Sequence, residues 1–265
     1  MHMASGRFVS KAALLSTTLA LLAGAAPVAQ ALRHPVPHTR GAADSDVDAA
    51  ASDTAPPRSK PVSDGVLPGR LSALPFALKL TGRAETVTVA GDSLTVVAPP
   101  GSDLYAPAGG PAKDTAPRVT FTPQGDFIFS ARVTRPDKGK YEGGALIISA
   151  SPDHWAKILF ERLNDATHAV SSSVADPVSD NSYHMRLPAS VAAVWLKIVR
   201  VGGSVMLYAS EDGKRWEILR DFPLAASAAV DVGFVGQSPG GGPFAARFSD
   251  VHYQATSLKD YWQGT

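Results

Sequence analysis

A series of short alternating strands between Leu71 and Tyr253 is the feature that most constrains the fold. Residues 194–201 and 204–210, for example, flank a Gly202-Gly203 turn as the two arms of a hairpin. A continuous apolar run at 144–150 predicts a strand that is covered on both sides. Turn signals recur about every ten residues, and no long stretch has helical spacing. The sequence contains no repeat of fixed period, which argues against a propeller or a solenoid. The sequence therefore predicts an all-β sandwich or barrel.

The N-terminus has the pattern of a secretory signal peptide over residues 1–31. Arg7 and Lys11 form a basic region, residues 12–26 are mainly Ala and Leu, and Ala29-Gln30-Ala31 is a small-x-small cleavage signal. The apolar stretch is shorter than the roughly 20 residues that a membrane span needs. An uncleaved anchor or an alanine-rich helix is the alternative. We expect export to the periplasm or the extracellular space, with no membrane span after cleavage.

Composition then divides the rest of the chain into three parts. Residues 32–68 are rich in Pro, Ala and Ser without an apolar period, which is typical of a disordered linker that tethers a domain. Residues 69–255 carry the strand pattern and form the predicted β-sandwich domain. Residues 256–265 are a C-terminal tail containing Tyr261-Trp262, which either folds back as a short element or stays loose.

Charge and cysteine content exclude several classes of partner and of stabilisation. The 265 residues include 25 Lys and Arg against 24 Asp and Glu, a net charge of +1. Cleavage after Ala31 removes Arg7 and Lys11, which leaves 23 basic residues and a net charge of −1. A nearly neutral protein has no electrostatic attraction to nucleic acid or anionic membrane. The chain has no cysteine, so burial of its 45% hydrophobic residues must hold the domain together.

One strand, residues 155–162, combines an aromatic ring with charges on a single face. Successive side chains alternate, so Trp155, Lys157 and Glu161 point one way and residues such as Ile158 point into a core. Lys157 and Glu161 lie about 13 Å apart along a strand and cannot pair directly. Each therefore needs a partner on a neighbouring strand or on a ligand. The face is either a solvated polar surface or a groove floor on which Trp155 stacks against a sugar.

Four further residues are candidates for the same groove. Asp103 and Tyr105 follow a strand end, where they can line a cleft or cap a turn, and Asp180 has the same ambiguity. Trp195 shares a strand face with Lys197, so it is a second stacking candidate or a core residue.

Signatures of catalysis and of metal binding are not expected. The sequence has neither the ExDxxE carboxylate cluster of jelly-roll glycosidases nor an HExxH metal motif, and we predict no serine nucleophile elbow. A carboxylate pair from different strands, such as Glu142 with Glu161, is the arrangement that a hydrolase would need. Only Glu211 adds an oxygen ligand near the Asp212-Gly213 turn, which leaves a structural calcium ion unsupported. We predict no cofactor.

From Leu71 to Tyr253 the chain resembles a bacterial concanavalin A-like family of unknown function, often labelled "regulation of enolase protein 1-like". The segments that carry this resemblance are 101–105, 141–146, 155–161, 179–180, 195–200, 210–216 and 233–239. This chain has Glu142-Gly143 where the family has Asp-Gln, Asn181 where it has Trp, and Tyr105 where it has Trp. The resemblance implies a jelly-roll sandwich of two antiparallel sheets with a concave face, in the superfamily of lectins and glucanases. It implies no established activity.

Three functional hypotheses follow from these observations. The first is an exported, non-catalytic binding module for a glycan or glycoconjugate, in which Trp155 stacks on the sugar and Asp103, Lys157, Glu161 and Asp180 bond its hydroxyls. The second is a domain that binds a protein partner or serves an envelope-structural role. The third is a glycoside hydrolase or lyase that uses Glu161 and Glu142. We rank them in that order.

Overall fold

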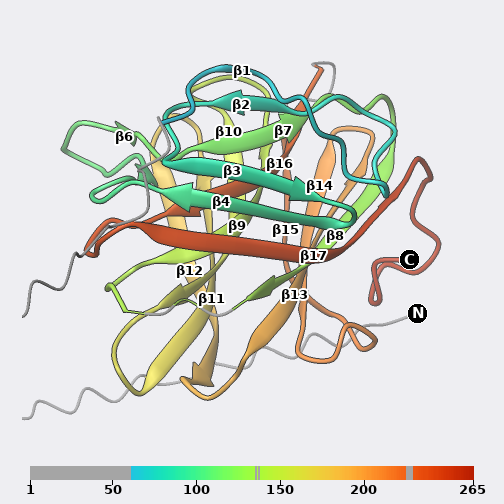
Figure 1. Cartoon of the computed structure of the whole chain (residues 1–265). Helices are drawn as coiled ribbons and strands as arrows, with labels where there is room; N and C mark the ends of the chain where they lie inside the picture. The colour runs from blue at the N-terminus through green and yellow to red at the C-terminus, as the bar shows by residue number, and fades with distance from the viewer. Residues whose placement is uncertain (1–60, 135, 137, 225–228) are drawn as a thin grey trace, which may run out of the picture. The chain divides into compact units, whose positions relative to one another are not determined.

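The computed structural model describes residues 61–134, 136, 138–224 and 229–265, and these form strands and turns without a helix (Figure 1). The predicted all-β fold is confirmed, since two large antiparallel sheets pack as a jelly-roll sandwich. In that described part, no helix qualifies as a membrane span. The predicted signal peptide and the linker up to residue 60 lie outside the described residues.

The larger sheet has eight strands, and the chain enters it before residue 69, the expected start of the domain. In spatial order it contains β1 (Gly65–Val66), β2 (Lys79–Thr81), β7 (Arg118–Phe121), β16 (Asp231–Gln237), β9 (Gly143–Ser149), β10 (Trp155–Arg162), β11 (Thr167–Ala175) and β12 (Ser179–Pro188). Strands far apart in sequence, such as β16 and β9, are neighbours here, as a jelly roll requires.

The smaller sheet has seven strands. In order it contains β15 (Glu217–Pro223), β14 (Ser204–Ser210), β13 (Ala193–Val201), β8 (Phe127–Thr134), β17 (Phe244–Gln254), β4 (Ser93–Ala98) and β3 (Thr86–Ala90). A separate hairpin pairs β5 (Leu104–Tyr105) with β6 (Lys113–Asp114).

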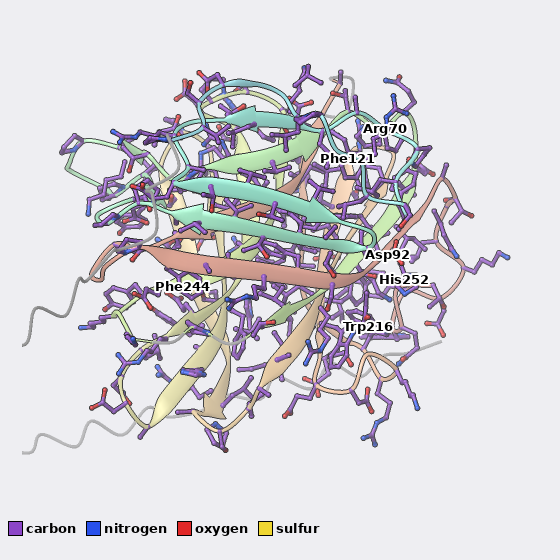
Figure 2. All side chains as sticks on the ribbon, viewed as in Figure 1. Arg70, Asp92, Phe121, Trp216, Phe244 and His252 are labelled. Carbon is purple, nitrogen blue, oxygen red and sulfur yellow. The ribbon has the colours of Figure 1, made fainter. Side chains whose placement is uncertain are left out.

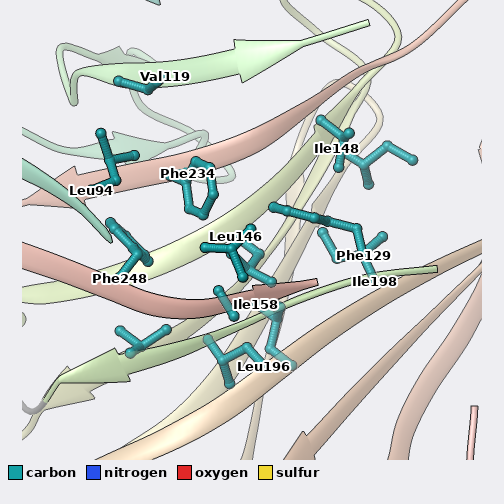
Figure 3. Packing of buried hydrophobic residues seen from close by; sticks show 14 of the residues in the cluster. Leu94, Val119, Phe129, Leu146, Ile148, Ile158, Leu196, Ile198, Phe234 and Phe248 are labelled. Carbon is teal, nitrogen blue, oxygen red and sulfur yellow. The ribbon is translucent and has the colours of Figure 1, made fainter. Parts of the chain in front are cut away.

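The main core lies between the two sheets, where the inward residues of each alternating strand meet (Figure 3). The ring of Phe234 lies 5.3 Å from that of Phe129 and 4.9 Å from that of Phe248, so aromatic contacts join β16 to both β8 and β17. Leu146 and Ile158 add aliphatic packing from β9 and β10. Full burial of each such side chain stabilises the fold by about 1.5–3 kcal/mol.

A second apolar cluster lies on the outer face of the eight-stranded sheet, beneath residues 102–106, which we call the crossing segment. The cluster consists of Leu104, Ala106, Ala116, Ala145, Ile147, Trp155, Leu159, Ala175 and Val235. Strand β9 is therefore covered on both faces, as the apolar run at 144–150 predicts. The crossing segment makes part of this face a second interior.

Residues 256–265, the C-terminal segment, fold back onto the outer face of the seven-stranded sheet. The Tyr208 hydroxyl donates to the carbonyl of Tyr261 at 2.7 Å, and the backbone N–H of Trp216 donates to the side-chain oxygen of Gln263 at 3.4 Å. Figure 2 shows Trp216 on the side of the domain where the chain ends. Of the two alternatives for the tail, the structure shows the folded one.

Candidate functional site

A pocket of about 410 Å³ lies on the outer face of the eight-stranded sheet, beside the crossing segment. Its volume is in the range of roughly 300–1,000 Å³ that is usual for ligand sites. The pocket is lined by Asp103, Tyr105, Lys113, Tyr141, Lys157, Leu159, Glu161, Ser171, Ser172, Ser173, Asn181, Ser182, Tyr183, Gln237 and Pro239. Most of these side chains are polar or aromatic.

Strand register builds the floor of this pocket. Lys157 of β10 is opposite Ser173 of β11, which is opposite Asn181 of β12. Two residues further along these strands, Ser171 of β11 is opposite Tyr183 of β12. Residues opposite one another in a sheet share a face. Three neighbouring strands therefore present one continuous polar surface.

Lys157 is the buried cation of the floor, with 3% of its surface exposed. Its Nζ donates to the carbonyl of Leu104 and to Oε1 of Gln237, both at 2.6 Å. Burial lowers the pKa of Lys157, and the carboxylates of Asp103 and Glu161 oppose that shift. An ammonium has three N–H donors, and the third has no hydrogen-bond partner among the described residues. Lys157 is also one of the residues that line the pocket.

Glu161 is the buried acid of the floor, with 5% of its surface exposed. One carboxylate oxygen accepts a hydrogen bond from the hydroxyl of Ser171. Burial raises the pKa of Glu161, while the Ser171 hydrogen bond and the charge of Lys157 lower it. Within the part of the chain that the structure describes, no hydrogen bond reaches the other oxygen. The floor thus offers an acceptor as well as a donor.

Tyr105, Tyr141 and Tyr183 bring aromatic rings to the pocket, and Tyr183 is the most exposed at 48%. Tyr141 has a φ of 64°, a left-handed conformation that is strained for a bulky residue. Its backbone N–H donates to the carbonyl of Arg162 at 2.8 Å, and its carbonyl accepts from the side-chain amide of Gln237 at 3.0 Å. Burial, together with Glu161, raises the pKa of Tyr183 to about 12, so its phenol is neutral at physiological pH.

Trp155 lies apart from the other strand residues of the predicted site. It shares a face with Lys157 and Glu161, as expected from the alternation. Its ring, however, packs under the crossing segment against Leu104 and Ala106, and it is only 4% exposed. The crossing segment arrives from a distant part of the sequence, which strand periodicity does not reveal. Trp155 does not line the pocket that contains Lys157 and Glu161, but it lines a different pocket of about 470 Å³.

The structure brings Asp103, Tyr105, Lys157 and Glu161 together in the pocket, but it places three other predicted residues elsewhere. Glu142 lies beside a separate pocket, where its carboxylate accepts from the N–H of Lys138 at 3.0 Å. Asp180 is exposed and pairs with Arg220 of β15. Trp195 belongs to the seven-stranded sheet, with the guanidinium of Arg132 5.4 Å from its ring centre. The proposed Glu142–Glu161 pair is therefore divided between two pockets.

Sequence reasoning missed several residues of the pocket. Asn181 and Tyr183 alternate on β12 beside the serines of β11, and this local signal could have indicated them. Tyr141 and Gln237 are at a turn and a strand end, 96 residues apart. Lys113 reaches the pocket from the β5–β6 hairpin, where its Nζ lies 3.7 Å from Asp103. Only the tertiary fold brings these last three together.

Residues 236–240 have the sequence GQSPG, which fits the GxSxG pattern, so the prediction that this motif is absent was wrong. Ser238 is fully buried, and its hydroxyl donates to the carbonyl of Gly242 at 2.6 Å. A nucleophile elbow needs an exposed serine between a strand and a helix. These residues instead end β16 in a glycine loop, so the motif is structural. The described residues also contain no group of three or more side chains able to hold a metal ion.

Comparison with known proteins places the chain in a family. Residues 82–256 match the family described as "Protein of unknown function (DUF1349)", and the chain belongs to it. That description does not mention enolase, so the enolase label stays a prediction. No curated protein matches the sequence.

Solved structures share the fold. A functionally unknown protein from Saccharomyces cerevisiae has a TM-score of 0.61 and 20% identity, over 67% of this chain and 95% of that chain. The GH43 BlXynB protein from Bacillus licheniformis has a TM-score of 0.52 and 13% identity, over 68% of this chain. The match spans 37% of that longer protein. At these identities the likeness extends to the fold alone.

Proposed function

We propose that this domain is an exported, non-catalytic carbohydrate-binding module. Its site is the pocket of about 410 Å³ that Lys157, Glu161 and three tyrosines line. The observation that carries the proposal is the pairing of Lys157 and Glu161 on the pocket floor, each with a hydrogen-bonding position not used by the protein. A sugar hydroxyl both donates and accepts, so hydroxyls at different positions of a sugar can bond to these two side chains. Tyr105, Tyr141 and Tyr183 supply apolar ring faces for the C–H surface of a pyranose.

The charges of the pocket favour binding over hydrolysis. Glycosidases use two carboxyl groups on opposite sides of the bond that breaks. Here Asp103 is held beside Lys113, and Glu161 is held by Ser171. Glu142, the other acid that a hydrolase would recruit, lies in a different pocket. Residues 1–31, with their cleavage signal, support the exported location.

A glycan array with the purified protein, with and without calcium, tests the proposal. We expect a reproducible signal that Tyr183→Ala weakens about tenfold or more, equivalent to about 1.4 kcal/mol. Trp262→Ala is the matched control, because it removes an aromatic ring that is 69% exposed on the C-terminal segment, outside the pocket lining. A blank array under both conditions would reject carbohydrate binding and favour the alternative of a protein partner.

A further inference from the structure

A second pocket, of about 470 Å³, lies on the same outer face of the eight-stranded sheet and shares no lining residue with the pocket of Lys157 and Glu161. Strands β2, β7, β16, β9 and β10 supply most of its lining. Lys113 of β6 lines the first pocket and its neighbour Asp114 lines the second, so the β5–β6 hairpin lies between them. We call this second cavity the β7 pocket, and its volume is also in the range of ligand sites.

One wall of the β7 pocket is a block of two cations and two hydroxyls. Lys79 of β2 is opposite Thr120 of β7, and Thr81 of β2 is opposite Arg118 of β7. Residues opposite one another share a face of the sheet, as do residues two apart in one strand, and all four line the pocket. Neighbouring strands lie only about 4.8 Å apart, so one ligand group can contact side chains from both strands.

Most polar groups of this block have no partner within the protein. Thr120 is only 6% exposed, yet its hydroxyl makes no hydrogen bond among the described residues. The ammonium of Lys79 has neither a hydrogen bond nor an ion pair in the same part of the chain. Arg118 contacts Asp114 through Nη1, which leaves donors on its other guanidinium nitrogens. A buried hydroxyl without a partner is costly, so Thr120 is a group that a ligand can satisfy.

The acids that line the β7 pocket leave Lys79 as its unneutralised cation. Asp114 pairs with Arg118. Asp231 is on β16, two strands away from β2, and its Oδ1 accepts a hydrogen bond from the hydroxyl of Thr122 at 2.6 Å. Positive charge therefore exceeds negative charge by one at the wall of β2 and β7, and this wall favours an anionic group.

The other side of the β7 pocket suits the body of a sugar. Strands β9 and β10 contribute apolar surface from Ile147 and Trp155, which can face the C–H groups of a pyranose. Asp231 and Ser149, which are opposite each other on β16 and β9, add acceptors for hydroxyl groups. A ligand that matches both sides combines hydroxyls and C–H surface with an anionic group.

We infer that the β7 pocket is a second binding site, for a sugar residue that bears an anionic group, either the carboxylate of a uronic acid or a sulfate ester. The anionic group lies against Lys79, Thr120 and the remaining donors of Arg118, and the sugar ring lies toward Ile147 and Trp155. This site goes beyond the proposed function and does not depend on the first pocket.

Calorimetry on the full chain tests this inference with ligands that differ only in charge. The probes are oligomers of galacturonate, glucuronate and mannuronate with their neutral methyl esters, and sulfated galactan oligomers with their unsulfated forms. We expect an acidic probe to bind about tenfold or more tightly than its neutral counterpart, because hydrogen bonds to charged groups are the stronger ones. The uronate and sulfate arms show which anionic group the site accepts. Equal affinity of acidic and neutral forms, or no heat with any acidic probe, would overturn the inference.

Variants test whether the acidic probe occupies the β7 pocket. We expect Lys79→Gln to weaken its binding about tenfold, and Thr120→Val, which keeps the shape and removes the hydroxyl, to weaken it about threefold. Neither side chain has a hydrogen bond to lose within the described residues, so urea unfolding should show no loss of stability in either variant. Lys214→Gln is the matched control, because it removes an exposed cation outside the pocket lining. Affinity in Lys79→Gln equal to that of the parent protein would reject the site.

Tyr183→Ala separates the failure of this inference from the failure of the proposed function. Tyr183 lines the first pocket only, so its loss should leave the affinity for the acidic probe unchanged. If Tyr183→Ala weakens the acidic probe and Lys79→Gln does not, the probe occupies the first pocket, and the inference fails while the proposed function stands. If the acidic probe depends on Lys79 and no glycan depends on Tyr183, the inference stands and the proposed function fails.

Discussion

Each of the two sheets carries a buried lysine on its outer face, and the two lysines are used differently. Lys157 donates to the carbonyl of Leu104 in the crossing segment. Lys197 donates to the carbonyls of Gln263 and Gly264 in the C-terminal segment, at 3.0 Å and 2.9 Å. In both places an ammonium fixes a length of backbone that covers the sheet. The covering chain satisfies the lysine, and the lysine satisfies carbonyls that would otherwise be left without a donor.

The surroundings of the two ammonium groups explain why we propose a site beside Lys157 and not beside Lys197. Lys157 has the carboxylates of Asp103 and Glu161 nearby and a pocket beside it. Lys197 lies 3.8 Å from the ring centre of Trp216 and 5.5 Å from that of Tyr208, so aromatic rings occupy the space around it. A buried charge therefore does not by itself identify a functional site. Each lysine makes two hydrogen bonds, so what distinguishes Lys157 is the polar pocket that it lines.

Replacing each lysine by methionine should give the largest contrast between the faces. Lys157→Met removes the donor from the pocket floor, and we expect the glycan affinity to fall about 100-fold, or about 2.7 kcal/mol. Lys197→Met is the matched control and should retain the affinity of the parent protein. Each change leaves two acceptors without their donor, so we expect unfolding free energy to fall by about 1–3 kcal/mol in both. Calorimetry and urea unfolding measure the two effects, and equal affinities would show that the pocket is not the binding site.

Removing residues 259–265 of the C-terminal segment should have the next largest effect, and only on stability. A chain that ends at residue 258 lacks both carbonyls that hold Lys197 and the carbonyl that accepts from Tyr208. We expect the unfolding free energy to decrease by about 1–3 kcal/mol, because these buried groups then depend on water. Glycan binding should be unchanged, since the pocket lining includes no residue of this segment. Weaker binding in a variant that remains folded would mean that the two faces are coupled.

The fold was more accessible from sequence than the site, and the distances along the chain show why. Strand alternation depends on neighbours two residues apart, so the face shared by Trp155, Lys157 and Glu161 was predictable. The partners of Lys157 are 53 and 80 residues away, at Leu104 and Gln237. No pattern within the strand itself predicts that a segment about 50 residues earlier in the chain covers Trp155 and leaves Lys157 beside a pocket. The resemblance supplied the sandwich but not the path of the crossing segment.

The free energy of unfolding should change with pH in the alkaline range, because Lys197 loses its proton there. Burial lowers the pKa of Lys197 from its ordinary 10.5 to about 8. Between these values the unfolded chain binds more protons than the folded one, so this residue makes stability rise with pH from about 8 towards 10.5. Below pH 8 both states are protonated, and the folded state bears the full penalty of the buried charge. Urea midpoints of the parent protein should therefore rise relative to those of Lys197→Met between about pH 8 and 10, and parallel curves would exclude this assignment.

The smallest expected change is in the pH at which glycan affinity declines on acidification. The hydroxyl of Ser171 holds the ionised form of Glu161 and so lowers its pKa against the raising effect of burial. In Ser171→Ala this support is lost, the pKa of Glu161 moves further upward, and the carboxylate acceptor is protonated at a higher pH. We expect affinity to be nearly unchanged at neutral pH but to decline on acidification earlier than in the parent protein. Ser182→Ala is the control, because it removes a hydroxyl from the same pocket without a hydrogen bond to Glu161 among the described residues. Affinity measured between about pH 4 and 8 would contradict the role of Glu161 as acceptor if all three proteins followed one curve.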